Sequence, residues 1–219
     1  YMMSKMAAAI GKTRDARKYA ELHENVKKAF NEKYVRAEDG VTVAPYVAMR
    51  WPGMPVNPDA PKDGDLVPVD TQTSYALPLA YNLFDDSVKQ KVVDNLVRNI
   101  EAHENTLTTG FIGTPHLAVA LSENGRDDVA YKLFEQTAYP SWLYPVLQGA
   151  TTMWERWNSY TIENGFGPVE MNSYNHYSYG AIAEWMFSHS LGIQRDEDKP
   201  GYKHIILQPK VGGTLEFAK

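Results

Sequence analysis

Glu155 is the residue of this chain whose type and surroundings best suit chemistry. It lies in the segment Thr151-Thr152-Met153-Trp154-Glu155-Arg156-Trp157, between two indole rings. Sugars offer hydroxyl groups to charged acceptors and C–H faces to rings, so Trp154 is a candidate sugar contact. Cleavage of a glycosidic bond uses two carboxyl groups, and Glu155 is a candidate for one of them. A solvated carboxylate that pairs with Arg156 is the alternative, because most charged residues lie on the surface.

The pair Asn175-His176 is the second candidate for contacting a substrate. We expect this pair at the N-terminus of a helix over about residues 174–191. There the imidazole could donate a hydrogen bond to a sugar hydroxyl, and the helix dipole would favour its neutral form. A hydrogen-bonded structural histidine is the alternative interpretation.

Three more side chains are weaker candidates for sugar contacts. His116 follows the predicted helix start Thr114-Pro115 by one residue and so occupies the same relative place as His176. We expect the His116 side chain either to face the same open end of the helical domain as His176 or to form part of a polar layer between helices. Trp51 and Trp142 lie in loops beside prolines, where a ring either forms a sugar platform or holds the loop in place.

Helical periodicity covers most of the chain. Apolar spacing and cap signals predict helices over about 1–10, 13–34, 71–84, 86–103, 114–124, 126–138 and 174–191. Thr13 is a predicted helix cap, and Asp70 and Gln72 at the next helix start are either rim residues or part of a cap and hydrogen-bond network. Six prolines in 39–69 predict a long irregular loop, and 203–208 is predicted to form a strand.

The helices fall into pairs in which a more apolar helix precedes a charged, amphipathic one. This pattern holds for 71–84 with 86–103 and for 114–124 with 126–138. A helix that is apolar all round is buried, whereas an amphipathic helix lies outside. The sequence therefore predicts an all-α fold, a partial (α/α)6 barrel of helical hairpins. We expect the rest of the barrel to precede Tyr1 in a longer protein.

Composition excludes several other classes of function. The chain has 219 residues, 43% of them apolar and 22% charged, which is typical of a globular protein. With no cysteine there are no disulfides, thiolate zinc sites or cysteine nucleophiles, and the compartment stays open. A net charge of −5 without a basic run argues against nucleic acid and anionic membranes as partners. Phosphate-loop and metal-binding spacings are absent, so no metal or organic cofactor is predicted.

Five stretches, in this order, closely resemble bacterial α-L-rhamnosidases with an (α/α)6-barrel catalytic domain. They are Asp70-Thr71-Gln72-Thr73, Gly110-Phe111-Ile112-Gly113-Thr114-Pro115, Gly149-Ala150-Thr151-Thr152-Met153-Trp154-Glu155, Met171-Asn172-Ser173-Tyr174-Asn175-His176-Tyr177 and Pro200-Gly201-Tyr202-Lys203-His204. The resemblance covers nearly the whole chain. It implies an inverting glycoside hydrolase in which Glu155 is the general base and His176 contacts a terminal rhamnose.

The same resemblance implies how the chain is divided. Residues 1–194 would be the C-terminal part of the barrel domain, and 200–219 would begin a C-terminal β-sandwich. The family's general acid lies in an acidic segment ending in Gly-Trp that does not occur here, so we expect it before Tyr1 and expect the fragment alone to be inactive. Exposed inner faces of half a barrel would favour self-association. The alternatives are another (α/α)6 glycosidase or lyase, or a non-catalytic carbohydrate-binding fragment.

Overall fold

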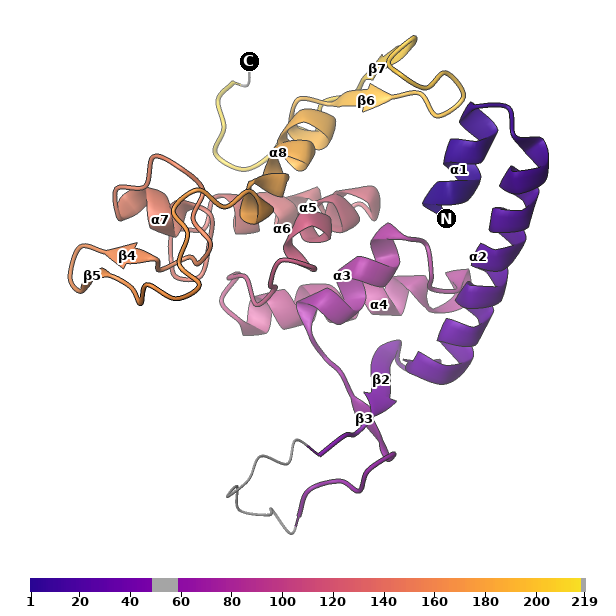
Figure 1. Cartoon of the computed structure of the whole chain (residues 1–219), viewed down its shortest axis with the longest axis horizontal. Helices are drawn as coiled ribbons and strands as arrows, with labels where there is room; N and C mark the ends of the chain where they lie inside the picture. The colour runs from indigo at the N-terminus through magenta and orange to yellow at the C-terminus, as the bar shows by residue number, and fades with distance from the viewer. Residues whose placement is uncertain (49–58, 218–219) are drawn as a thin grey trace.

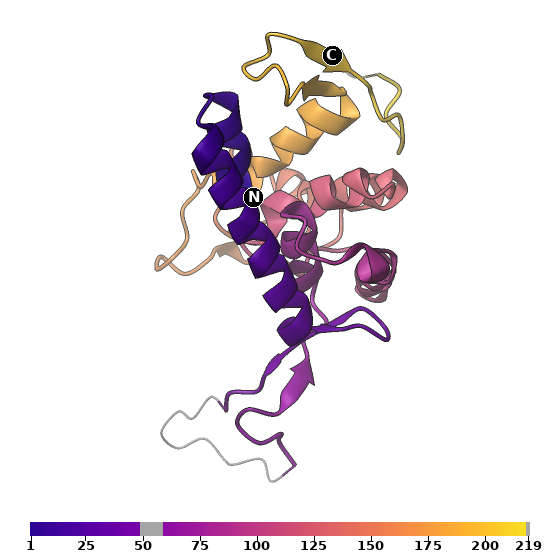
Figure 2. The ribbon, with the colours of Figure 1, turned by 90° about the vertical axis from the view of Figure 1, so that its right-hand side faces the viewer.

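The computed structural model describes residues 1–48 and 59–217 and is helical with a few small sheets (Figure 1). Three helical hairpins follow one another along the chain. They are α1 (Met2–Ala9) with α2 (Thr13–Tyr34), α3 (Gln72–Ala80) with α4 (Asp86–Ala102), and α5 (Thr114–Glu123) with α6 (Asp127–Phe134). In both views α1 lies beside the first half of α2 (Figures 1 and 2).

The last helical segment completes the layer formed by the first helices of the later hairpins. It runs without a break through the 3-10 turn η1 (Ser178–Ala181), α8 (Ile182–Trp185) and the π-helical turn η2 (Met186–Ser190). Helix α3 packs against α5, and α5 packs against α8. The short helix α7 (Leu143–Leu147) lies apart from this layer, at the end of the molecule opposite α1 and α2 (Figure 1).

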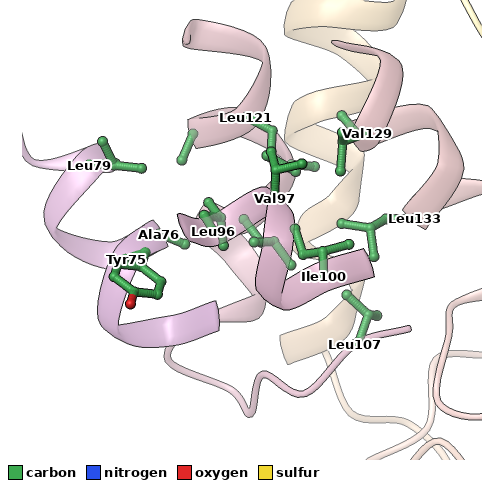
Figure 3. Packing of buried hydrophobic residues seen from close by; sticks show 14 of the residues in the cluster. Tyr75, Ala76, Leu79, Leu96, Val97, Ile100, Leu107, Leu121, Val129 and Leu133 are labelled. Carbon is green, nitrogen blue, oxygen red and sulfur yellow. The ribbon is translucent and has the colours of Figure 1, made fainter. Parts of the chain in front are cut away.

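The core lies where α3, α4, α5 and α6 meet. The helix predicted to be amphipathic, α4, has an apolar stripe that is buried along its whole length and faces residues of the other three helices, as Figure 3 shows. The stripe consists of Val88, Val92, Val93, Leu96, Val97 and Ile100. Because the spacing of 3.6 residues per turn places these side chains on one face, the amphipathic pattern accounts for this packing.

Local interactions set the start of α3 and α5. The Thr71 side chain accepts the Ser74 N–H at 3.1 Å, and the Ser74 hydroxyl accepts the Thr71 N–H at 3.2 Å, so a reciprocal capping box begins α3. At α5 the cap is Gly113, not Thr114 as its position before Pro115 suggested. A side chain at Gly113 would collide with Thr73, so glycine permits the close approach of these two helix starts.

Four predictions about helix ends differ from the structure. Thr13 is the first residue of α2 instead of its cap, and the helices predicted over 71–84 and 126–138 end early, at Ala80 and Phe134. The last helix begins at Ser178 instead of about residue 174. The reason is that the preceding residues direct backbone hydrogen bonds to residues 153–155 and not into a helix.

Three small antiparallel sheets are present in the described part of the chain. The first joins β1 (Val35–Arg36), β2 (Val41–Pro45) and β3 (Leu66–Pro68), so part of the predicted irregular loop is sheet. The second joins β4 (Tyr160–Thr161) to β5 (Gly165–Phe166), and the third joins β6 (Ile193–Arg195) to β7 (Ile205–Leu207). The predicted strand over 203–208 is therefore present as β7, and its partner β6 lies on the other side of the predicted division near residue 200.

None of the helices in the described ranges has both the length and the apolar character that a membrane crossing requires.

Candidate active site

Two irregular segments cross beside the start of the last helix and bring the two principal candidates together. The Glu155 N–H donates to the Ser173 carbonyl at 2.8 Å, and the His176 N–H donates to the Met153 carbonyl at 2.9 Å. The Thr152 hydroxyl adds a third bond between the two segments, because it donates to the carbonyl of residue 174 at 2.6 Å. These bonds place Glu155 and His176 on adjoining segments although the two residues are 21 positions apart in the sequence.

The carboxylate of Glu155 is half-buried and fixed on one side. Its Oε2 accepts the Ser173 N–H at 2.7 Å, a short bond of the kind expected for a charged acceptor. Within residues 1–48 and 59–217, Oε1 accepts no hydrogen bond and Glu155 forms no ion pair, so the alternative pairing with Arg156 is not observed. The arrangement leaves Oε1 available to accept a proton from a bound water or hydroxyl.

The imidazole of His176 is oriented by rings and by one backbone group. It stacks on Phe111 with centroids 4.6 Å apart and an interplanar angle of 15°, and it lies parallel to Tyr177. The Ser178 N–H donates to its Nδ1 at 3.4 Å. A neutral imidazole whose Nδ1 is an acceptor carries its proton on Nε2, so Nε2–H is the group that can donate to a ligand.

The two indole rings beside Glu155 are buried and pack against neighbouring tyrosines. Trp154 is 7% exposed and meets Tyr174 edge-on at 5.7 Å. Trp157 stacks on Tyr179 with centroids 3.8 Å apart. The rings of Trp154 and Trp157 are both largely covered by other residues, so a sugar could touch only the small exposed part of Trp154. The exposed Asn175 precedes His176, and its N–H donates to the Ser173 hydroxyl at 3.2 Å.

Trp142 lies in the hydrophobic core and not at a surface. It is 5% exposed, and its indole N–H donates to the Tyr179 carbonyl at 3.0 Å. This geometry favours the second of its two predicted roles, holding the loop in place, over a sugar platform. Trp51, the other loop tryptophan, lies outside the described residues.

His116 lies on a different element from Glu155 and His176 and contacts Tyr81. It lies inside the first turn of α5, half-buried, with its ring 5.2 Å from that of Tyr81 and its Nε2 3.5 Å from the tyrosine oxygen. Burial lowers the pKa of His116, and Glu184 acts in the opposite direction. The predicted equivalence with His176 is wrong because His176 precedes its helix, whereas His116 lies within one. These contacts favour the polar layer between helices.

Two further residues position the site, and only Gln72 was predicted to take part in a hydrogen-bond network. Phe111 lies in one of the stretches that carry the resemblance and was assigned no role, yet its ring stacks on His176. Gln72 is fully buried, and its side-chain amide donates to the Thr106 carbonyl at 2.9 Å and accepts the Thr108 N–H at 3.0 Å, which fixes the loop that leads to Phe111. Its counterpart Asp70 accepts the Tyr75 hydroxyl and an Arg98 N–H, so both belong to hydrogen-bond networks.

No cluster of three or more side chains suited to holding a metal ion occurs in the part of the chain that the structure describes.

Comparison with known families decides the relationship. Residues 1–190 match the family model described as the bacterial alpha-L-rhamnosidase 6 hairpin glycosidase domain. The chain belongs to this six-hairpin glycosidase family. The predicted family is thereby confirmed, and so is the predicted helical domain. The closure of the hairpins into a barrel, and the roles of the individual site residues, remain predictions.

Proteins similar in sequence to this six-hairpin chain are named α-L-rhamnosidases. The chain is 38% identical over 218 residues to an α-L-rhamnosidase of Streptomyces avermitilis, covering 100% of this chain and 18% of the relative. An α-L-rhamnosidase of Formosa agariphila is 39% identical over 209 residues, covering 95% of this chain and 20% of the relative. The chain therefore spans about a fifth of the length of these relatives.

Solved structures agree with the sequence comparison. The Streptomyces avermitilis α-L-rhamnosidase complexed with L-rhamnose superposes with a TM-score of 0.76 at 39% identity, covering 96% of this chain and 18% of that one. The native α-L-rhamnosidase of Aspergillus terreus gives a TM-score of 0.77 at 30% identity, covering 96% and 21%.

Proposed function

We propose that this chain is part of the catalytic domain of a longer α-L-rhamnosidase, an inverting glycoside hydrolase in which Glu155 is the general base. The supporting observation is the asymmetric environment of the carboxylate: Oε2 is held by the Ser173 N–H, and Oε1 accepts nothing from the described residues. A general base needs a fixed orientation and a free lone pair directed at the water it activates. Relatives named α-L-rhamnosidases support rhamnose as the sugar.

The proposed reaction takes place between this carboxylate and an acid from elsewhere in the protein. Glu155 Oε1 accepts a proton from water as the water oxygen bonds to the anomeric carbon and the glycosidic bond breaks. Inversion requires an acid about 6.5–9.5 Å away on the opposite side of the sugar, where it protonates the leaving oxygen. We place that acid in the part of the domain that precedes this chain.

His176 has a binding role in this proposal. Its Nε2–H donates to a rhamnose hydroxyl, and its stacking on Phe111 fixes the direction of that bond. Pre-orientation of a donor reduces the freedom lost on binding. Asn175, and the exposed part of Trp154, lie close enough along the chain to contact the same sugar.

The decisive test is Glu155→Gln in the longer enzyme, with an aryl α-L-rhamnoside as substrate. The amide keeps the size of the side chain but cannot accept the proton, so kcat should fall by roughly 10²–10⁴-fold. Glu163→Gln, which removes an exposed carboxylate from the turn between β4 and β5, is the matched control and should change kcat less than twofold. A Glu155→Gln enzyme that is nearly as active as the wild type would return Glu155 to a structural role.

Substrate choice is tested separately from the base. A panel of aryl glycosides offered to the same enzyme should show a preference for α-L-rhamnoside. Preference for another sugar, or an elimination product, would favour a different (α/α)6 glycosidase or a lyase.

A second candidate function, carbohydrate binding without turnover, applies to the 219 residues alone. The chain covers only a small share of the length of its relatives, and only one of the two catalytic carboxyl groups is assigned within it. Both observations favour binding without turnover for the chain alone. Apolar side chains of α1, namely Met2, Met3, Met6 and the adjoining Ile10, are exposed and support the expected self-association. Sedimentation of the chain should show oligomers, whereas a stable monomer with one sharp melting transition would contradict this expectation.

A further inference from the structure

The β4–β5 hairpin lies at the end of the molecule that carries α7 (Figure 1). Residues of this hairpin line a small hollow. Its volume is about 190 Å³. We call it the Arg156 hollow, and its lining includes Arg156, Asn158, Thr161, Asn164, Phe166 and Asn172. A cation, three amides and an aromatic ring form a lining suited to a polar ligand with an apolar face.

The cation of this hollow has no internal partner. Arg156 is exposed, and its guanidinium forms no ion pair with any residue in 1–48 or 59–217. The nearby carboxylates in sequence, Glu155, Glu163 and Glu170, all lie beyond ion-pairing distance of it. A guanidinium presents a planar set of N–H donors that matches a carboxylate, so an unpaired one in a hollow favours an acidic ligand.

Asn172 adds an unsatisfied acceptor to the same lining. Its Nδ2 donates to the Ser159 carbonyl and to the Tyr174 hydroxyl, each at 3.2 Å, and this pair of bonds fixes the orientation of the amide. Its Oδ1 is buried and receives no hydrogen bond. Leaving a buried acceptor unsatisfied costs about 1–3 kcal/mol, so this oxygen suits a ligand that brings a hydroxyl donor.

Phe166 supplies a fixed apolar surface. It is 77% exposed, yet its ring is held edge-on by Tyr160 at 5.2 Å and by Tyr174 at 5.6 Å. At the neighbouring Gly167 a Cβ would lie 3.0 Å from Asn172 Nδ2, so glycine allows the hairpin to close on Asn172. An exposed ring with aromatic neighbours, beside hydrogen-bonding groups, is suited to the C–H face of a sugar.

The hollow adjoins the proposed catalytic carboxylate through the chain itself. Arg156 directly follows Glu155, and Asn172 directly precedes Ser173, whose N–H holds Glu155 Oε2. A ligand in the hollow is therefore next to the base side of the rhamnose site. In an inverting enzyme the leaving group departs from the opposite side, so the hollow suits a nearby unit of the same glycan and not the unit bonded to the rhamnose.

We propose that the Arg156 hollow binds a uronic acid unit of the glycan that carries the rhamnose. The carboxylate pairs with Arg156, a hydroxyl donates to Asn172 Oδ1, and the ring lies against Phe166. The volume is below the roughly 300–1,000 Å³ of drug-sized pockets, which limits the occupant to a single sugar unit. The link to rhamnose rests on the function proposed above, but binding of an acidic sugar does not.

The first test measures binding to the 219-residue chain, independently of catalysis. Glucuronate and glucose, which differ in the carboxylate, are titrated while the amide signals of Gly167 and Asn172 are followed by NMR. Glucuronate should bind at least tenfold more tightly than glucose, and Arg156→Gln should remove that difference. Arg17→Gln, which deletes an exposed, unpaired guanidinium on α2, is the matched control and should leave it unchanged.

The second test uses the longer enzyme and a rhamnose-terminated acidic oligosaccharide beside its carboxyl-reduced form. The ratio of kcat/KM for the two should fall about tenfold in Arg156→Gln, through KM, and stay constant in Arg17→Gln. Equal binding of glucuronate and glucose, or equal effects of both substitutions, would overturn the proposal. If the enzyme hydrolyses no rhamnoside but binds glucuronate through Arg156, the hollow stands and the proposed function fails.

Discussion

The layer of α3 to α6 and the segments over residues 150–177 are held together by different interactions. In the helical layer, aliphatic side chains such as Leu96, Leu117 and Leu121 fill the space between helices and are fully buried. In the site segments, stacked rings and backbone hydrogen bonds between distant parts of the chain hold the structure, as at Trp157 on Tyr179. The contrast indicates that stability depends mainly on the first region and the proposed chemistry on the second.

Leu121→Ala should give the largest effect on stability. Leu121 is fully buried in α5, so its truncation leaves a cavity and should lower the free energy of unfolding by about 2–5 kcal/mol. Leu147→Ala is the matched control, because Leu147 ends α7 with 60% of its surface exposed, and it should cost under about 0.5 kcal/mol. Denaturant unfolding of both variants measures the difference. Equal losses would show that the helical layer does not dominate stability.

Phe111→Leu should affect the site with little effect on the fold. Leucine keeps the apolar contact but loses the flat ring that stacks on His176, so the histidine loses its fixed direction. In the longer enzyme we expect KM for an aryl α-L-rhamnoside to rise about tenfold, equivalent to about 1.4 kcal/mol of binding. The melting temperature should change little, because Phe111 is 38% exposed.

Phe111→Tyr separates stacking from general packing. Tyrosine keeps the ring, so KM should stay within about twofold of the wild type while Phe111→Leu raises it. Similar KM values for both variants would mean that the stack on His176 does not orient the sugar contact.

The same contrast explains what the sequence could predict. Helix α4 was predicted to within one residue at its C-terminus because a single amphipathic face reports directly on which side is buried. The late start of the last helix was missed because its preceding residues bond to a segment about 20 residues away, and no local pattern records such a contact. Local propensity describes regular elements well and tertiary hydrogen bonding poorly.

The candidate site was predictable only in part, for the same reason. Glu155 and His176 stand out by residue type, and the structure places them on adjoining segments. Gln72 was predicted only as a rim residue or a member of a hydrogen-bond network, and Phe111 was assigned no role, since an amide at a helix start and a phenylalanine between glycines are ordinary. Their importance arises from the partners that folding brings to them, Thr106 and Thr108 for the amide and His176 for the ring.

His189→Gln should give the smallest effect and locate an acid-sensitive point in the helical region. His189 is 7% exposed in η2, its Nδ1 lies 2.8 Å from the Ser188 hydroxyl, and Lys210 donates its N–H to the His189 carbonyl. Burial lowers the pKa of His189, Lys210 lowers it further, and Asp127 and Glu184 act in the opposite direction. The folded protein therefore resists protonation at a pH where the unfolded chain accepts it.

The sign of the pH effect follows from this difference. Below a pH of about 6.5 the unfolded state binds a proton at His189 that the folded state does not, so stability falls as the pH falls, until the folded pKa is passed. One proton contributes at most about 1.4 kcal/mol per pH unit. His189→Gln should reduce the slope of the unfolding free energy against pH, from pH 7 down to the folded pKa of His189. The slope should not vanish, because the pKa of His116 is also lowered. An unchanged slope, measured by denaturant unfolding across that range, would show that protonation of His189 does not contribute to the acid sensitivity of the fold.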